Sequence, residues 1–170
     1  IMSGFCREKI GPLLEKSGFP ANRLVLEITE SLLMGNDNRV NEALDGFREM
    51  GVELAVDDFG TGYSALNYLR NFPVSLLKID RSFIRDMVEN HGDARLVETI
   101  VAMAGGLDLG VVAEGVETPD QHYALQKRGC SMVQGFFDSN PVDAGAVDLL
   151  LSEGNGIEDQ IPADTSTRAS

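Results

Sequence analysis

Cysteine, histidine and basic residues are all scarce in this chain of 170 residues. The two cysteines, Cys6 and Cys130, lie far apart and form no C-x-x-C pattern, so we expect them to be reduced and structural. Lys and Arg number 14 against 27 Asp and Glu, and the resulting net charge of -13 argues against direct binding of a nucleic-acid polymer. A phosphate-bearing ligand stays possible, because bound divalent cations would reverse the local charge.

Long hydrophobic runs are also missing. No run approaches the roughly 20 apolar residues that span a bilayer, and no signal peptide is visible. We therefore expect no membrane contact by this segment and a cytoplasmic location. The composition, 43% hydrophobic and 24% charged, is typical of a soluble globular domain. We interpret Ile1 as the start of a piece cut from a longer chain, and the small polar residues 152–170 predict a disordered tail.

Short apolar runs alternate with helical patterns between these ends. Most of the runs lack polar alternation, which predicts buried parallel strands; they cover residues 24–28, 52–56, 76–79, 111–113 and 132–137. Strands that alternate with helices indicate an α/β fold, either a doubly wound sheet or part of an α/β barrel.

Helix ends are marked by residues with known capping preferences. Gly51 suits the end of an amphipathic helix that covers Val40 to Met50. Asp93 is the predicted N-cap of a later helix, and Thr118 with Gln121 predicts a capping box for the next.

Polar side chains recur at the carboxyl end of every predicted strand. Reading along the chain, these are Glu27, Asp57 with Asp58, Lys78 with Asp80, Glu114, and Gln134. Parallel strands bring their carboxyl ends to one face of the sheet, where ligands bind in both candidate folds. Taken alone, Asp57 and Asp58 are better explained as caps of a following helix, but the shared register favours a metal site.

The converging acids suit a particular class of metal. Four carboxylates without histidine or cysteine favour Mg²⁺ or Mn²⁺ over zinc, and their number is compatible with two ions. Adjacent residues of a strand point to opposite faces. Asp57 and Asp58 can therefore share the site only if the strand ends there, which the turn beginning at Gly60 would allow.

Other ionisable residues near these strand ends have two readings each. Lys78 either holds the attacking water or forms an ion pair with Asp80. Glu30 could cap or anchor a neighbouring loop rather than touch a metal. Glu117 could be a metal ligand or the acid that precedes the Thr118 cap, and the second reading is favoured. His91 and His122 lie in polar contexts and are expected to be solvated.

Taken together, five stretches resemble the EAL-domain family of cyclic-di-GMP phosphodiesterases. They occur in family order across roughly residues 10–150: Leu26-Glu27-Ile28-Thr29-Glu30-Ser31, Asp57-Asp58-Phe59-Gly60-Thr61-Gly62-Tyr63-Ser64, Leu77-Lys78-Ile79-Asp80-Arg81-Ser82-Phe83, Val112-Ala113-Glu114-Gly115-Val116-Glu117-Thr118, and Gly129-Cys130 with Gln134-Gly135-Phe136. The resemblance implies that residues 1–151 form about the last five strand-helix units of an incomplete TIM-like barrel, with mostly parallel strands.

The resemblance also implies a function. It predicts two Mg²⁺ or Mn²⁺ ions, hydrolysis of cyclic di-GMP to linear pGpG, and a homodimer. By resemblance the metal ligands would be Glu27, Asp57, Asp58 and Glu114, and the catalytic residues Lys78 and Glu114. Residues near the substrate or behind the ligands would be Asp80, Gln134, Glu30 and Glu117, with Glu30 steadying the loop 57–63, which couples to dimerisation in this family.

Departures from the family pattern limit this expectation. The Glu-Ala-Leu strand and an early Asn ligand should precede Glu27 and are absent, while Glu42-Ala43-Leu44 is a decoy inside an amphipathic helix. Asn140 stands where the family usually carries a basic residue before Pro141. We therefore expect the 170 residues alone to be inactive. The alternative function is a non-catalytic cyclic-di-GMP receptor, although receptors usually lose metal ligands and none of those visible here is lost.

Overall fold

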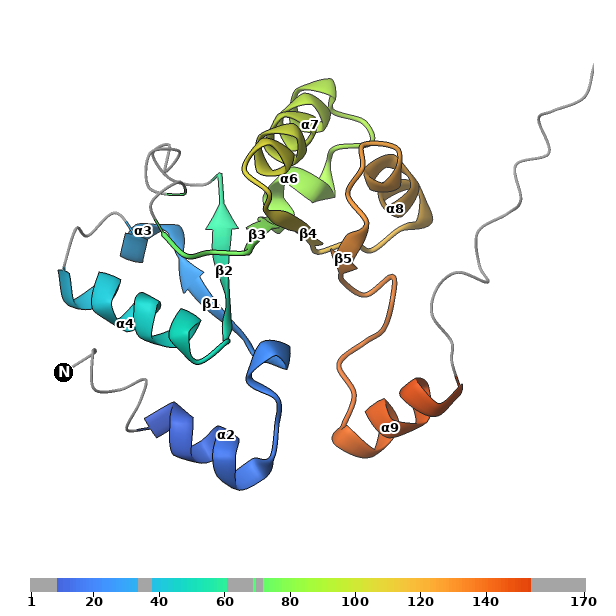
Figure 1. Cartoon of the computed structure of the whole chain (residues 1–170). Coiled ribbons are helices and arrows are strands. Elements are labelled where there is room, and N and C mark those ends of the chain that lie inside the picture. Colours follow the sequence, from blue (N-terminus) through green and yellow to red (C-terminus); the bar gives the residue numbers. More distant parts are fainter. Residues whose placement is uncertain (1–8, 34–37, 61–68, 70–71, 154–170) are drawn as a thin grey trace, which may run out of the picture.

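The chain folds around a five-stranded parallel sheet (Figure 1). The structure is a computed structural model, and it describes residues 9–33, 38–60, 69 and 72–153. The strands are β1 Val25–Thr29, β2 Glu53–Phe59, β3 Leu76–Ile79, β4 Gly110–Glu114 and β5 Met132–Gln134. All four neighbouring pairs are parallel, and the spatial order β1-β2-β3-β4-β5 follows the chain. A doubly wound sheet would reverse its order partway across. The uninterrupted order is that of a barrel segment.

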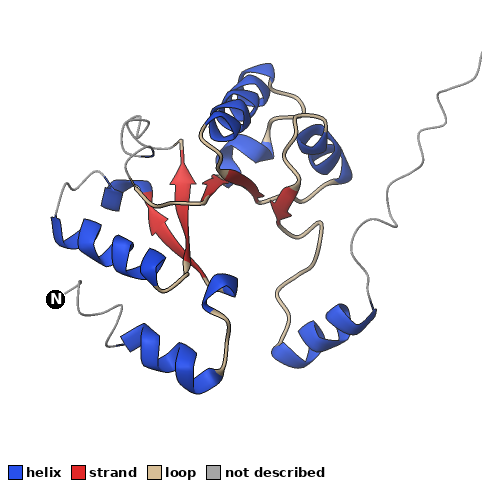
Figure 2. Ribbon diagram, in the orientation of Figure 1, coloured by secondary structure: helices blue, strands red, loops and turns tan. Residues whose placement is uncertain are grey.

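Helices precede the first strand, occupy most of the connections between strands and follow the last strand. They are α2 Gly11–Ser17, the short 3₁₀ turn η2 Ala21–Arg23, α3 Glu30–Leu33, α4 Asn38–Glu49, α6 Arg81–Arg85, α7 His91–Gly106, α8 Pro119–Gln126 and α9 Ala144–Glu153. Figure 2 shows α4, α7 and α8 along the outer side of the curved sheet. None of the described helices has both the length and the apolar character needed to cross a membrane.

The core lies between the sheet and these outer helices. Leu77 and Ile79 of β3 are fully buried and belong to one cluster with Val97 and Ile100 of α7 and Leu125 of α8. In α4, Ala43 and Leu44 are each only 3% exposed. The letters Glu-Ala-Leu at residues 42–44 therefore belong to a packed helix, as predicted, and not to a strand end.

Predicted helix ends are partly confirmed. Thr118 and Gln121 form the capping box of α8, and Gly51 has a φ of 81° two residues after Glu49, the last residue of α4. The prediction for α7 was wrong, because the N-cap is Asn90, whose side chain accepts from the amide of Gly92 and donates to Asp93. The expected tail began too early as well, since α9 continues to Glu153; residues 154–170 lie outside the described part of the chain.

Strand β5 is shorter than the sequence predicted because the backbone turns at Gly135. The Val116 amide donates to the Gln134 carbonyl at 3.2 Å, and the Phe137 amide donates to the Val116 carbonyl at 3.0 Å. The turn thus wraps closely around Val116. A Cβ at Gly135 would lie 2.0 Å from the Val116 carbonyl oxygen. Only glycine fits between these backbone segments.

We expect Gly135→Ala to lower the free energy of unfolding by about 3 kcal/mol, because backbone atoms cannot yield as a flexible side chain can. Urea unfolding followed by circular dichroism would measure the loss. Gly105→Ala is the matched control, since no atom beyond its own stretch of helix lies within 4 Å of its added Cβ, and alanine in a helix should keep or raise stability. Equal stabilities of the two variants would contradict the close fit at Val116.

Candidate metal centre

Asp57 and Asp58 reach one site through an irregularity in β2. The pairing of β2 with β3 shifts register between Val56 and Phe59, and Asp58 has a φ of 55°. The sequence predicted that the strand must end at these aspartates, but it continues to Phe59. A bulge with one residue in the left-handed region turns the second carboxylate instead. Aspartate adopts this conformation more readily than most residues, because its short side chain can hydrogen-bond locally.

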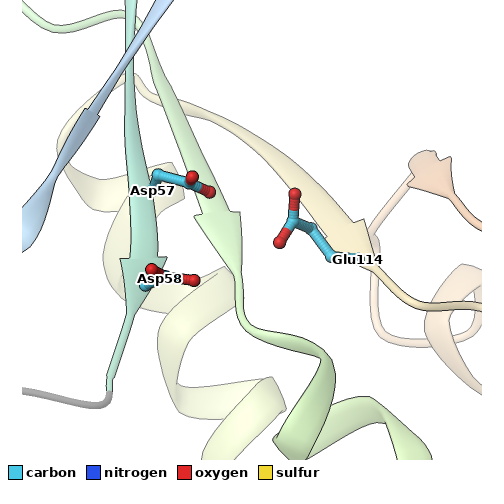
Figure 3. A group of neighbouring side chains, drawn as sticks. All are labelled: Asp57, Asp58 and Glu114. Carbon is cyan, nitrogen blue, oxygen red and sulfur yellow. The ribbon is translucent and has the colours of Figure 1, made fainter.

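A carboxylate from β4 joins the two aspartates. Asp57, Asp58 and Glu114 each place one oxygen within 4.8 Å of the others. Figure 3 shows Asp57 and Glu114 pointing toward one another from β2 and β4, with Asp58 beside them. Asp57 and Glu114 are half-buried and Asp58 is exposed, so the group opens to solvent on one side. Three of the four predicted metal ligands are thus brought together.

The ammonium of Lys78 lies among the acids of three strands. Its Nζ is 2.5 Å from Glu114 Oε1, 2.7 Å from Glu27 Oε1 and 3.2 Å from Asp57 Oδ1. Lys78 is only 5% exposed. Burial by itself lowers the pKa of Lys78, but the close contacts with the carboxylates of Glu114, Glu27 and Asp57 outweigh it and hold that pKa well above its ordinary value. Lys78 is therefore a cation in this site.

Asp80 has a different role from the ion pair that the sequence allowed. Its carboxylate is the N-cap of α6 and accepts from the Ser82 amide at 2.9 Å and from the Ser82 hydroxyl at 2.5 Å. Burial raises the pKa of Asp80, but these bonds lower it by more, so that the pKa lies below its usual range. The sequence allowed an ion pair of Lys78 with Asp80. Lys78 does form ion pairs, but its partners are Glu27, Asp57 and Glu114.

Glu27, the fourth predicted ligand, stands apart from the three-carboxylate group. Its side chain is 49% exposed and contacts Lys78 from the edge strand β1. The parallel register pairs Glu27 with Ala55 and Thr29 with Asp57, so Glu27 lies two residue pairs earlier than Asp57, on the same face of the sheet. Lys78 thereby links Glu27 to Asp57 and Glu114.

The other residues that the sequence predicted for the site make separate contacts of their own. Glu30 is 5% exposed, and its Oε2 accepts from the Gly60 amide at 3.4 Å, so it anchors the start of the loop that follows β2. The rest of that loop, residues 61–68, lies outside the described residues. Glu117 is exposed just before the Thr118 cap. Gln134 is exposed and pairs in register with Glu114 across β4 and β5.

Two residues of α8 make contacts that the sequence did not indicate. Gln121 is buried, and besides closing the capping box it donates through Nε2 to the carbonyls of Ile84 and Arg85. The capping motif predicted the role of Gln121 at the start of α8, but it did not predict the contact of Gln121 with α6. His122 was expected to be solvated, yet it is half-buried with its ring 5.1 Å from the ring of Phe137. The prediction was wrong because the turn after β5 folds back against α8.

The residues fit a hard divalent cation. All the converging donors are carboxylate oxygens, the ligands that Mg²⁺, Mn²⁺ and Ca²⁺ prefer. Asp57 Oδ1 is buried and lies 3.2 Å from Lys78 Nζ, close enough for an ion pair, but it receives no well-directed hydrogen bond from the described residues. A buried carboxylate oxygen with this incomplete environment has coordination capacity left for a metal.

Known proteins match both the sequence and the fold. The Pseudomonas aeruginosa protein "Cyclic di-GMP phosphodiesterase NbdA" is 45% identical over 144 residues, which are 85% of this chain and 18% of that protein. The crystal structure of the EAL domain of Mycobacterium smegmatis DcpA is similar with a TM-score of 0.84 and 40% identity, covering 91% of this chain and 69% of that one. The Klebsiella pneumoniae BlrP1 manganese and cyclic-di-GMP complex gives 0.73 and 31%, covering 83% and 38%.

The match to a family agrees with the geometry of the strand ends. The chain spans about a fifth of the curated relative and more than two thirds of the DcpA chain. The family model for the EAL domain matches residues 2–141, and these contain β1 to β5 with every acid of the centre. The sheet is accordingly part of a TIM-like barrel. On these grounds the chain belongs to the EAL domain family.

Proposed function

We propose that this chain supplies part of the active site of a phosphodiesterase that hydrolyses cyclic di-GMP to linear pGpG with two metal ions. The observation that carries the proposal is the group of Asp57, Asp58 and Glu114, two of which also contact the ammonium of Lys78. The relatives support the substrate class, since NbdA is named a cyclic di-GMP phosphodiesterase and BlrP1 was solved with manganese and cyclic di-GMP.

Each residue of the group has a defined task in this proposal. Asp57, Asp58 and Glu114 would hold the ions, with Glu27 as a further ligand. Bound Mg²⁺ or Mn²⁺ would lower the pKa of a water and neutralise the phosphodiester charge. A protonated lysine offers three N–H donors and no acceptor. Lys78 would therefore orient the attacking water and stabilise developing negative charge, while a carboxylate such as Glu114 accepts the proton.

We place the activity in the longer protein. The described sheet has two edges, β1 and β5, that pair with no further strand among the described residues. A barrel needs its remaining strands to enclose the substrate, so the 170 residues alone should turn over little or no cyclic di-GMP. The homodimer and the two-ion stoichiometry belong to the same proposal and are tested with the longer protein.

The first test is turnover by a longer protein that contains this chain. We expect Mn²⁺-dependent release of pGpG, measured by chromatography, and a loss of at least about 100-fold in Asp57→Asn, because a ligand and its charge are removed. Glu42→Gln is the matched control, since Glu42 is an exposed acid of the decoy sequence in α4. Tight binding of cyclic di-GMP without turnover would sink the enzyme proposal and favour the receptor alternative.

The second test is metal binding by this chain itself, measured by titration calorimetry with Mn²⁺. Asp58→Asn should weaken binding by about 10-fold or more, because the amide removes a charged ligand while asparagine keeps the same backbone freedom. Asp108→Asn is a close control, since Asp108 is exposed and has a φ of 57° against 55° for Asp58. If both variants bind Mn²⁺ like the parent chain, Asp58 is not a ligand.

The third test concerns the charge balance around Lys78. Lys78→Met leaves Glu27, Asp57 and Glu114 without their shared counter-ion, and we expect the free energy of unfolding to fall by about 3 kcal/mol. Added Mn²⁺ should recover part of the loss, since it replaces the missing positive charge. Lys16→Met, at an exposed position of α2, should change little. A Lys78→Met loss that Mn²⁺ does not reduce would argue against a cation site among these acids.

A further inference from the structure

The side-chain amide of Gln121 uses every hydrogen-bonding position that it has. Gln121 is 6% exposed, and its Oε1 accepts from the backbone amides of Glu117 at 2.8 Å and Thr118 at 3.0 Å. Its Nε2 donates to the backbone carbonyls of Ile84 at 3.3 Å and Arg85 at 3.1 Å. A glutamine amide has two acceptor and two donor positions. Both ends are therefore satisfied, and the side chain is held in one orientation.

Only half of these bonds serve the capping box of α8. Glutamine and glutamate both suit the third helical position of a capping box, because the box uses the side-chain oxygen. The two bonds to α6 need donors, and an ionised glutamate has none. Gln121 therefore makes a second connection that the cap does not require. We call the two bonds from Nε2 to the carbonyls of Ile84 and Arg85 the α6–α8 link.

The link joins the two segments that follow the strands of Lys78 and Glu114. Helix α6 begins two residues after the end of β3, and the residues before α8 follow β4 directly. The two segments also touch close to the strands, since a Cβ at Gly115 would lie 2.6 Å from Arg81 Cβ. The α6–α8 link thus holds the far end of a contact that begins beside the candidate metal centre.

Glu114 needs a connection of this kind on the side of β3. The pairing of β3 with β4 runs only as far as Ile79 and Ala113, so among the described residues it stops one residue short of Glu114. Glu114 pairs with Gln134 of β5, a strand of three residues at the edge of the sheet. Its Oε1 nevertheless lies 2.5 Å from Lys78 Nζ. A small movement of the β4 end away from β3 would lengthen this contact.

Resting on the proposed function, we propose that Gln121 is a positioning residue for the metal centre. The α6–α8 link holds the segments after β3 and β4 at the separation that brings Glu114 to Asp57 and Lys78. Because the polar atoms of the Gln121 side chain are all bonded to backbone groups, it acts through the backbone and not as a ligand. Loss of such a partner behind a metal ligand typically costs about 10- to 100-fold in metal affinity or activity.

The test compares the two halves of one capping box. Gln121→Met keeps a side chain of similar length but removes its four hydrogen bonds. Thr118→Ala removes only the acceptor of the Gln121 backbone amide, at 3.3 Å, and leaves the α6–α8 link in place. In titration calorimetry of this chain with Mn²⁺, we expect binding to weaken at least about fivefold in Gln121→Met and to change less than about twofold in Thr118→Ala.

Urea unfolding of both variants measures what each change costs in stability. A role of Gln121 in the stability of α8 alone would make the two variants alike in Mn²⁺ affinity, because both weaken the same cap. Equal Mn²⁺ affinity of Gln121→Met and the parent chain, or an equal loss in both variants, would overturn the inference.

Gln121→Glu separates the link from the cap. Its carboxylate still accepts from the amides of Glu117 and Thr118 but cannot donate to the carbonyls of α6. An added negative charge would by itself favour Mn²⁺, so weaker binding in this variant would come from the broken link. Circular dichroism checks that the variant is folded. An affinity at or above that of the parent chain would contradict the positioning role.

The proposed function is decided separately, by turnover of the longer protein. If the parent chain binds Mn²⁺ and the longer protein releases no pGpG, the enzyme proposal fails and the Mn²⁺ affinities still decide the role of Gln121. If turnover is normal and Gln121→Met binds Mn²⁺ like the parent chain, the positioning role alone is wrong. In an active longer protein, Gln121→Met should lower kcat more than it changes KM.

Discussion

The arrangement of the strand ends depends on the ammonium of Lys78. Leu77 and Ile79 on either side are fully buried against the outer helices, so alternation along β3 turns Lys78 to the opposite face. There it meets acids from β1, β2 and β4. Carboxylates this close repel one another unless a cation lies between them. Lys78 therefore makes it possible for the sheet to gather so much negative charge at one end.

A second constraint acts on the backbone around the acids. Glu114 is followed by Gly115 and Val116, and the segment is held on one side by Arg81 and on the other by the turn at Gly135. Gln121 fixes α8 to α6 in the same region. The end of β4 is consequently supported from several directions, as a residue that must hold a metal or substrate in a narrow range of positions requires.

Much of this was predictable because the signals are local. Buried strands, the capping box of α8 and the convergence of Asp57, Lys78 and Glu114 follow from apolar runs and from the geometry of parallel sheets. The bulge at Asp58 was not predictable, since it depends on the register with β3 and not on the residues of β2 alone. The same holds for His122 against Phe137 and for Gln121 against α6, which are contacts across long sequence separations.

The left-handed conformation of Asp58 also has an evolutionary consequence. Glycine would adopt a φ of 55° with less strain, and selection for stability alone would favour it there. Glycine, however, has no carboxylate to contribute to the group with Asp57 and Glu114. Position 58 therefore combines two demands that no single residue meets perfectly, a left-handed backbone and a carboxylate, and aspartate is the acid whose short side chain reconciles them best.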